Sequence, residues 1–224
     1  MSSDSAAQKT AVRRILILFA HPALEKSRFN RRLLLPVEHL PGVTLNDLYE
    51  NYPDMMIDVD REQQLLREHD VIVLQHPFYW YSTPAILKEW QDLVLQFGFA
   101  YGEGGDALRD KILINVTTTG GSKDSYSAEG INKYYMRQLL APLDRTANLC
   151  GMIYLPPFVL HGTHRMEARE GDKHALGYRR LLEALRDGEI SEAQAREFSA
   201  SSCEDMPCIN SFVNDLAPRE NAAQ

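Results

Sequence analysis

Three segments of the chain combine polar, aromatic and glycine residues in patterns that suit the binding of a small molecule. In the first, His21 to Asn30, Ser27 and Asn30 stand at a predicted helix start. Unpaired backbone N–H groups and the helix dipole favour an anion there, and His21 and Lys26 can add positive charge. The segment predicts a phosphate site, with a plain helix cap at Ser27 beside a surface histidine as the alternative.

The second segment, His76 to Ser82, holds a run of aromatic residues: Phe78, Tyr79, Trp80 and Tyr81. The run has neither helical nor strand periodicity, so it does not describe a buried face. Flat side chains stack well on a flat ligand, although Tyr and Trp are also enriched at protein interfaces. The segment predicts a ligand-stacking loop, and an interface at the same loop is compatible with it.

The third segment is Thr117, Thr118, Thr119, Gly120 and Gly121. Glycines let backbone N–H groups approach a ligand closely, and threonine hydroxyls form short hydrogen bonds. An ordinary Gly-Gly turn is the alternative. An aromatic loop facing a glycine loop makes a slot for a planar heteroaromatic ring. Because a phosphate site is predicted beside the slot, the ligand predicted is flavin mononucleotide (FMN).

The elements that must position these segments alternate between strands and helices. Apolar runs predict strands over residues 14–20, 43–49, 71–75, 111–117 and 152–160. Apolar residues at helical spacing predict helices over residues 27–40, Asp58 or Asp60 to His69, Pro84 to Phe97, 131–150, 173–187 and 191–198. Pro142 must bend the helix over 131–150 or start a new one. This alternation predicts an α/β protein with a doubly wound, five-stranded parallel sheet of order 2-1-3-4-5 and helices on both faces. Pro156 and Pro157 place the last strand at an edge. All three segments follow strands, where such a sheet binds its ligands.

Composition and charge suit a single globular domain of 224 residues. The 31 Asp+Glu outnumber the 24 Lys+Arg, which disfavours nucleic acid as a partner. No apolar run reaches the roughly 18 residues of a membrane helix, and Ile15 to Ala20 is too short for a signal-peptide core. We therefore expect a cytoplasmic protein. Three cysteines do not suit a disulfide framework, so we expect Cys203 and Cys208 to be reduced, with pairing in an oxidising compartment as the alternative.

Residues 1–11 are expected to form a loose extension, 12–187 a flavin-binding domain, and 188–224 a short helix with a polar, mobile tail. Gly102 to Ala107 matches the dinucleotide fingerprint, but it follows a helix and precedes a strand, the reverse of the required context. His161 and His164 have no cysteine or acidic cluster nearby to complete a metal site. We therefore expect no metal and interpret them as surface or pocket histidines.

Several of these residues belong to strings that recur in one family. The strings are Ala20-His21-Pro22, Ser27-x-x-Asn30, Asp47-Leu-Tyr-x-x-Tyr-Pro-Asp54, Gln75-His-Pro-x-x-Trp80-Tyr-Ser82, Leu87-Lys-x-Trp90-x-Asp92, Ala100-Tyr-Gly-x-Gly-Gly, Thr117 to Gly121 and Leu155-Pro-Pro-Phe158. The chain resembles the flavodoxin-like NAD(P)H:quinone oxidoreductases, and most closely the ancillary flavoproteins (KefF-like) of glutathione-regulated potassium efflux systems. The resemblance spans roughly residues 14–186, most of the chain.

The resemblance implies a homodimer that binds FMN, or alternatively FAD, with the active site at the dimer interface. A hydride would pass from NADPH or NADH to the flavin and two electrons then to a quinone, in ping-pong order. His21, Ser27, Arg28, Phe29 and Asn30 would hold the flavin phosphate and ribityl chain; Phe78, Tyr79, Trp80 and Tyr81 would line the isoalloxazine; Thr117 to Gly121 would line its other polar edge; and Tyr101 would reach the quinone pocket.

One departure concerns the residues after the glycines. The mammalian quinone reductases carry a tyrosine and a histidine there that steady charge on the reduced flavin. Tyr126 matches the tyrosine, but Asn132 stands where the histidine would be. The catalytic candidates are therefore Tyr126, Asn132 and Tyr101. An asparagine can donate a hydrogen bond but cannot titrate, so a proton would come from another group or turnover would be slower.

Two further functions compete with the reductase. The protein could be a regulatory ancillary subunit of a glutathione-gated potassium efflux transporter, with secondary reductase activity. Its link to the membrane would then run through the partner, since the chain has no lipid anchor or basic patch. A flavodoxin that shuttles single electrons is disfavoured, because His-Pro and Ser-x-x-Asn replace the usual Thr/Ser-Gly-rich phosphate loop. Arg28, Arg31 and Arg32 are candidates to meet the 2′-phosphate of NADPH, or form a solvated helix face.

Overall fold

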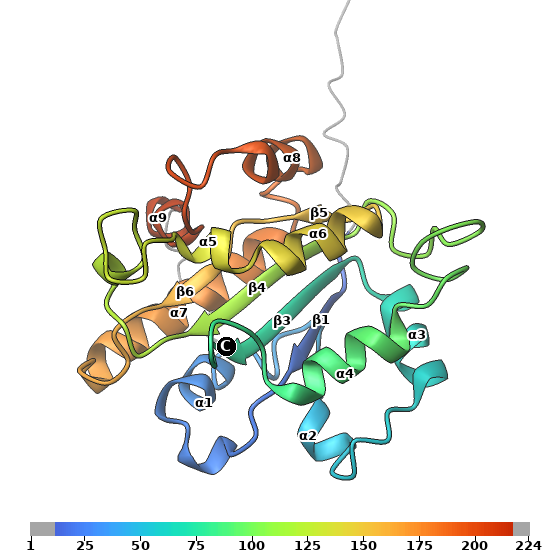
Figure 1. Ribbon diagram of the computed structural model, residues 1–224, viewed down its shortest axis with the longest axis horizontal. Coiled ribbons are helices and arrows are strands. Elements are labelled where there is room, and N and C mark those ends of the chain that lie inside the picture. The colour runs from blue at the N-terminus through green and yellow to red at the C-terminus, as the bar shows by residue number, and fades with distance from the viewer. Residues whose placement is uncertain (1–11, 217–224) are drawn as a thin grey trace, which may run out of the picture.

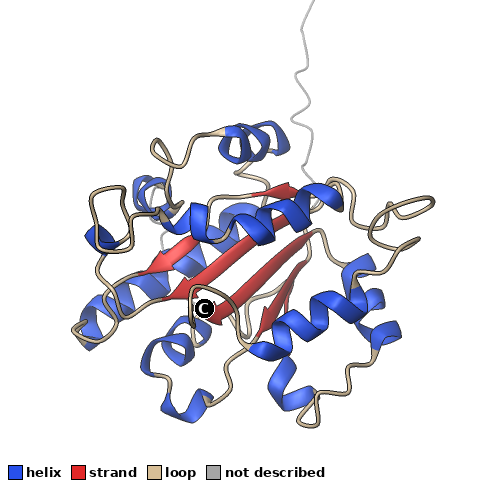
Figure 2. Cartoon of the chain, viewed as in Figure 1, coloured by secondary structure: helices blue, strands red, loops and turns tan. Residues whose placement is uncertain are grey.

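The computed structural model describes residues 12–216, which form a parallel sheet with helices on both faces (Figure 1, Figure 2). The strands are β1 (Ile15–Phe19), β2 (Val43–Asp47), β3 (Val71–Pro77), β4 (Ile112–Thr118), β5 (Ile153–Tyr154) and β6 (Phe158–Leu160). Their order is β2-β1-β3-β4-β5, and β6 also pairs with β4. The predicted doubly wound, flavodoxin-like topology is confirmed.

The three central strands bring the predicted ligand-binding segments to one edge of the sheet. Every residue of β1, β3 and β4 is buried, as expected for strands covered on both faces. In the parallel register, Phe19 pairs with Gln75 and Gln75 with Val116. The strands therefore end side by side, and the segments that follow them begin at the same edge.

The helices form two layers, each with its own apolar core. One layer consists of α1 (Arg28–Leu34), α7 (Ala168–Arg186), α8 (Glu192–Ala200) and α9 (Asn210–Asp215). The other consists of α2 (Leu48–Asn51), α3 (Val59–Glu68), α4 (Ala85–Val94), α5 (Met136–Leu139) and α6 (Ala141–Leu149). Single 3₁₀ turns, η1 (Leu24–Lys26) and η2 (Lys123–Ser125), lie in loops at the carboxyl edge of the sheet. No helix within residues 12–216 has the length and apolar character to cross a membrane.

Prolines account for two differences from the predicted elements. Pro156 and Pro157 divide the predicted strand 152–160 into β5 and β6, because neither can donate a hydrogen bond to the sheet. Both pieces lie at the edge beside β4, where the prolines place them. Residues 131–135 form turns instead of helix, and a new helix begins at Ala141 with Pro142 in its first turn.

The C-terminal segment differs more strongly from the expectation of a mobile tail. It contains α9, and Cys208, Ile209 and Val213 are buried against the rest of the molecule. Cys203 and Cys208 are free thiols, as is Cys150. The expected loose extension, residues 1–11, lies outside the described residues.

Candidate functional site

His21 begins the predicted phosphate segment as a buried side chain. Its Nδ1 accepts a hydrogen bond from the Ala23 N–H at 3.1 Å, so the ring proton of the neutral form sits on Nε2. Burial lowers the pKa of His21, and nearby Glu25 opposes that shift. The structure thus favours His21 as a neutral hydrogen-bond donor, in place of the positive charge expected from the sequence.

Ser27 is the N-cap of α1 and Asn30 lies in its first turn, and their side chains make different contacts. The Ser27 hydroxyl accepts the Asn30 backbone N–H at 3.2 Å and so caps the helix. The Asn30 side chain is buried and donates from Nδ2 to Thr118 Oγ1 at 3.0 Å. Its Oδ1 is buried and has no hydrogen-bond partner among residues 12–216. The plain helix cap is therefore present, and beside it lies an unsatisfied acceptor.

The arginines of α1 are engaged with α7 and the loop before it. Arg28 donates to the Met166 carbonyl at 3.3 Å, and its guanidinium lies 5.0 Å above the centre of the Phe29 ring. Arg32 forms an ion pair with Asp172. These contacts shape one wall of a cavity of about 320 Å³ beside the helix start, which Lys26, Ser27 and Arg31 also line.

The aromatic loop turns back on itself in a strained conformation. Tyr79 and Ser82 form an antiparallel bridge, and Ser82 N donates to Tyr79 O at 2.9 Å. Between them Trp80 and Tyr81 have φ values of 50° and 62°. This is the pattern of a type I′ turn, whose central positions strongly prefer Asn, Asp or Gly. Two bulky aromatic residues with positive φ indicate local strain of the kind that clusters at functional sites.

Ring contacts join the aromatic loop to the other two segments. The ring centroids of Tyr79 and His21 are 6.2 Å apart, and so are those of Phe78 and Tyr126. The Trp80 side chain, in contrast, is 94% exposed and contributes little to the packing of its own chain. The structure therefore brings all three predicted segments together, with one large aromatic side chain left free at the rim.

The threonine and glycine segment contributes hydroxyls and close backbone approach. The hydroxyls of Thr119 and Tyr126 are 2.5 Å apart, and Gly121 N donates to Thr119 Oγ1 at 3.3 Å. Thr117, in contrast, is fully buried and donates to the His76 carbonyl at 2.9 Å. A Cβ at Gly120 would lie 2.2 Å from a ring atom of His164. Only glycine fits there without displacing its neighbour.

The remaining catalytic candidates lie at different places. Asn132 is at the rim of the aromatic loop, where its Oδ1 accepts a hydrogen bond from the Tyr81 hydroxyl at 3.1 Å. Tyr101 is far from this edge. It follows the end of α4 and packs against Phe97, near the amino ends of the strands. The structure does not bring Tyr101 to the site of its own chain.

Sequence reasoning missed a fourth segment of the site. The residues after β6, His161 to His164, pack on the threonine and glycine segment. The rule that ligands bind beyond the carboxyl ends of strands would have found them. The prediction of one edge strand over residues 152–160 did not place the segment after Leu160 beside the end of β4.

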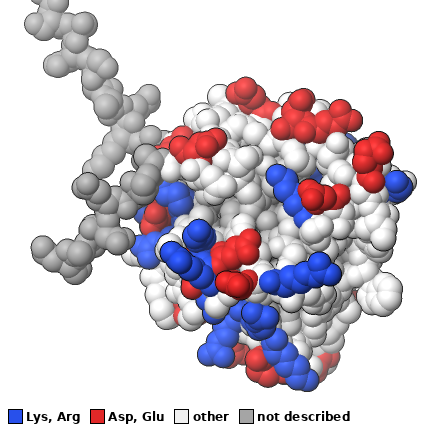
Figure 3. Space-filling model, turned by 90° about the vertical axis from the view of Figure 1, so that its left-hand side faces the viewer, with Lys and Arg blue, Asp and Glu red and all other residues white. Residues whose placement is uncertain are grey.

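Tyr126 and His161 also line a cavity of about 160 Å³ whose far side is formed by Pro207 and Cys208. The segment before α9 thus borders the candidate site. Figure 3 views the molecule from the left side of Figure 1, toward which β3 and β4 point. Basic side chains, with a few acidic ones among them, occupy the lower half of that surface, at the level of α1.

The arrangement fits a flavin. Within the part of the chain that the structure describes, Asn30 Oδ1 and His161 Nδ1 are buried polar atoms without hydrogen-bond partners, and buried polar groups normally have partners. Phe78, Tyr79, Trp80 and Tyr81 offer flat side chains for a planar ring, and the absence of a Cβ at Gly120 and Gly121 lets His164 and Tyr126 pack directly on the backbone beside them. Residues that can bind an anion lie at the start of α1. The residues of the site therefore match the three parts of a flavin mononucleotide: its phosphate, the polar edge of its ring system and the flat ring itself.

A parallel sheet of this order with three ligand loops at its carboxyl edge defines the flavodoxin-like proteins. Residues 13–182 match the family model described as having a flavodoxin-like fold (Flavodoxin_2), and the chain belongs to this family. Over 154 residues it is 51% identical to the "Glutathione-regulated potassium-efflux system ancillary protein KefG" of Pectobacterium atrosepticum, covering 69% of this chain and 84% of that protein.

Two solved structures extend the comparison. The general stress protein 14 of Treponema denticola, in complex with FMN, is 35% identical, with a TM-score of 0.74 over 77% of this chain and 99% of that one. The NADPH-quinone reductase of P. pentosaceus is 32% identical, with a TM-score of 0.70 over 75% of this chain and 97% of that one.

Proposed function

We propose that the protein is a flavin-dependent NAD(P)H:quinone oxidoreductase, which transfers two electrons from NADPH or NADH to quinones or related electrophiles in ping-pong order. The observation that carries the proposal is the convergence of three chemically distinct loops around an unsatisfied Asn30 Oδ1. Similarity to a protein solved with FMN and to an NADPH-quinone reductase supports it. FMN is the proposed cofactor and FAD the alternative.

The residues proposed to hold the cofactor fall into three groups. The group for the phosphate and ribityl chain is His21, Ser27, Arg28, Phe29 and Asn30; the group along the ring is Phe78, Tyr79, Trp80 and Tyr81; and the group at the polar edge is Thr117, Thr118, Thr119, Gly120, Gly121 and Tyr126. A bound flavin supplies the chemistry by accepting a hydride and passing two electrons to the acceptor.

The chain itself supplies orientation and hydrogen bonds. His21 would donate from Nε2 to a phosphate oxygen, and Asn30 Oδ1 would accept from a ribityl hydroxyl. Tyr126 and Thr119 share a hydroxyl pair in which either can donate, so Tyr126 would hold the polar edge of the ring. Of the first group Ser27 contributes through the helix start, since its hydroxyl is used in the cap. Thr117 would act by shaping the strand end.

A second candidate function is favoured by one observation, the 51% identity to a protein named as a KefG ancillary protein of a potassium efflux system. In this function the chain would act as a regulatory subunit and associate peripherally with the inner membrane through a transporter. In either function, residues 12–187 would form the flavin-binding domain, and residues 188–224 would form the C-terminal helix and tail. Both functions can reside in one protein.

The first experiment is to purify the protein, record its visible spectrum, release any chromophore by heat and determine its mass. We expect flavin bands and the mass of FMN. Bleaching by NADH or NADPH without oxygen, and return of the bands on adding a quinone, would establish the reductase. A colourless protein that takes up neither FMN nor FAD would refute it. Co-purification with a transporter tests the second function separately.

A further inference from the structure

The segment from His161 to His164 forms one unit with the threonine and glycine segment. Thr119 N donates to Leu160 O at 2.9 Å, Gly162 N to Gly121 O at 2.8 Å, and Thr163 N to Thr119 O at 3.1 Å. The hydrogen bonds run in both directions between the two segments. Any shift of one segment therefore moves the other.

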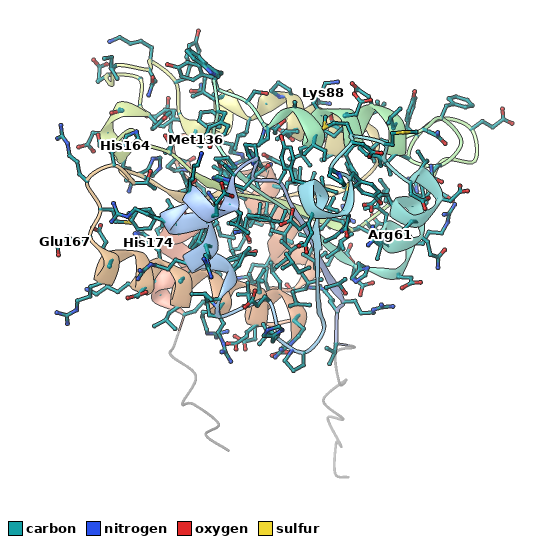
Figure 4. All side chains as sticks on the ribbon, turned by 90° about the horizontal axis from the view of Figure 1, so that it is seen from below. Arg61, Lys88, Met136, His164, Glu167 and His174 are labelled. Carbon is teal, nitrogen blue, oxygen red and sulfur yellow. The ribbon has the colours of Figure 1, made fainter. Side chains whose placement is uncertain are left out.

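Each histidine of this segment contacts a different part of the loop. The His164 ring fills the space beside Gly120, where a Cβ would lie 2.2 Å from its Nε2. The His161 ring lies 5.4 Å from the Tyr126 ring at an angle of 41°. Figure 4 shows His164 at the end of the molecule where Met136 and His174 also lie, away from Arg61.

Tyr126 is held from several sides, by Phe78 after β3 and by His161 after β6. The Phe78 ring lies edge-on at 6.2 Å. A Cβ at Gly121 would lie 3.0 Å from the Tyr126 ring, so the backbone there is in close contact with it. The Tyr126 hydroxyl can reach Thr119 Oγ1 at 2.5 Å only while the ring keeps this position.

The surroundings of His161 keep its imidazole uncharged. Burial lowers the pKa of His161 to about 4, and Lys123 and His174 add to the shift. The other ionisable groups that line the same cavity are Asp124, Tyr135, Cys208 and Tyr126 itself. A neutral imidazole can pack on the phenol ring without placing a second charge beside Lys123. Its Nδ1 is buried, and no described residue of the chain forms a hydrogen bond with it.

We infer that His161 is a positioning residue for Tyr126. It acts as an uncharged ring that fixes the direction of the Tyr126 hydroxyl. The inference rests on the proposed flavin site. It assigns a purpose to the His161-Gly-Thr-His164 motif, which neither a metal site nor the predicted loops explain.

A double-mutant cycle tests whether His161 acts through Tyr126. The variants are His161→Ala, Tyr126→Phe and the pair together, and the readouts are the dissociation constant of FMN and the absorption maximum of the bound flavin. We expect His161→Ala to weaken FMN binding about tenfold and to shift the absorption maximum. In the Tyr126→Phe background the same change should have an effect below about twofold, because the hydroxyl that His161 orients is gone.

Two further variants make the result decisive. His161→Phe keeps a flat, uncharged ring and should restore most of the affinity, even if His161→Ala proves too unstable to purify. His174→Gln, which alters a neighbour of His161 that lies on α7, should leave FMN affinity unchanged. Additive effects in the cycle, or wild-type affinity and spectrum in His161→Ala, would overturn the inference. A wild-type protein that binds no flavin would instead refute the proposed function.

Discussion

At Trp80 the requirements of flavin binding and of fold stability oppose each other. Its φ of 50° is unfavourable for a residue with a Cβ, and its side chain is 94% exposed. Within residues 12–216 the Trp80 side chain makes too little packing contact to offset this strain. We expect Trp80→Asn to stabilise the fold by about 1 kcal/mol, because asparagine tolerates this conformation. The same variant should bind flavin more weakly or raise the KM for quinone, because a stacking surface is lost.

Urea unfolding and FMN titration of the same preparation measure both effects. Met56→Asn is a useful control, since Met56 is also largely exposed but has no positive φ. It should change neither quantity. If Trp80→Asn leaves flavin affinity and quinone kinetics untouched, the aromatic loop is not part of the ligand site.

His161 makes the stability of the protein depend on pH. Its pKa is about 4 in the folded protein and 6.5 in the unfolded chain. Between these values the unfolded state binds more protons, so stability falls as the pH is lowered from 7 toward 4. The gap corresponds to a loss of about 3 kcal/mol. His161→Gln should lose correspondingly less stability over this range in urea titrations of the apoprotein. Equal pH dependence in both proteins would show that folding does not lower the pKa of His161.

At the scale of elements, the contact between α1 and α7 decides where the phosphate segment lies. Gly171 on α7 has no room for a side chain, because a Cβ would lie 2.6 Å from the Phe29 ring. We expect Gly171→Ala to destabilise the protein by about 1–3 kcal/mol. It should also weaken FMN binding, since Phe29 and α1 must move. Thermal unfolding and FMN titration measure these effects.

Gly177 offers a matched control on the same helix. A Cβ there would meet its nearest neighbour, Val213, at an ordinary 3.8 Å. Gly177→Ala should therefore stabilise the protein by about 0.5–1 kcal/mol through better helix propensity, with FMN affinity unchanged. Similar behaviour of the two variants would mean that α1 does not depend on close packing against α7.

The elements also show how far the sequence could be interpreted. Continuous apolar runs predicted β1, β3 and β4 to within two residues at each end, because strands covered on both faces have only apolar neighbours. In the C-terminal segment the helix predicted over 191–198 is present as α8, but α9 was not predicted, because Cys208, Ile209 and Val213 are buried by distant parts of the chain and form no periodic pattern. The His161 contact with Tyr126 was missed for a related reason: it joins two loops that only the sheet brings together.

For the whole molecule, the position of Tyr101 leads to a prediction: a quinone pocket that uses this residue would take it from a second copy of the chain. The resemblance assigns this residue to the quinone pocket, yet it follows α4 at the amino end of the sheet (Figure 1). The 10 residues of α4 separate it from the aromatic loop by about 15 Å. Large exposed side chains lie at both ends of the helix, Trp80 at 94% and Phe97 at 67%. A two-fold axis crossing α4 would place Trp80 of one copy beside Phe97 and Tyr101 of the other, since such an interface pairs each residue reciprocally.

This arrangement predicts a dimer in sedimentation experiments and complementation between defective subunits. Asn30→Leu disables the flavin loops, and Tyr101→Ala removes the side chain expected from the partner. In a heterodimer of the two, purified through different tags, one site combines both defects and the other combines neither. We expect such heterodimers to show about half of wild-type quinone reduction, although both parent dimers are poorly active. Heterodimer activity equal to the mean of the two parents would mean that each site lies within one chain, and that Tyr101 has no part in it.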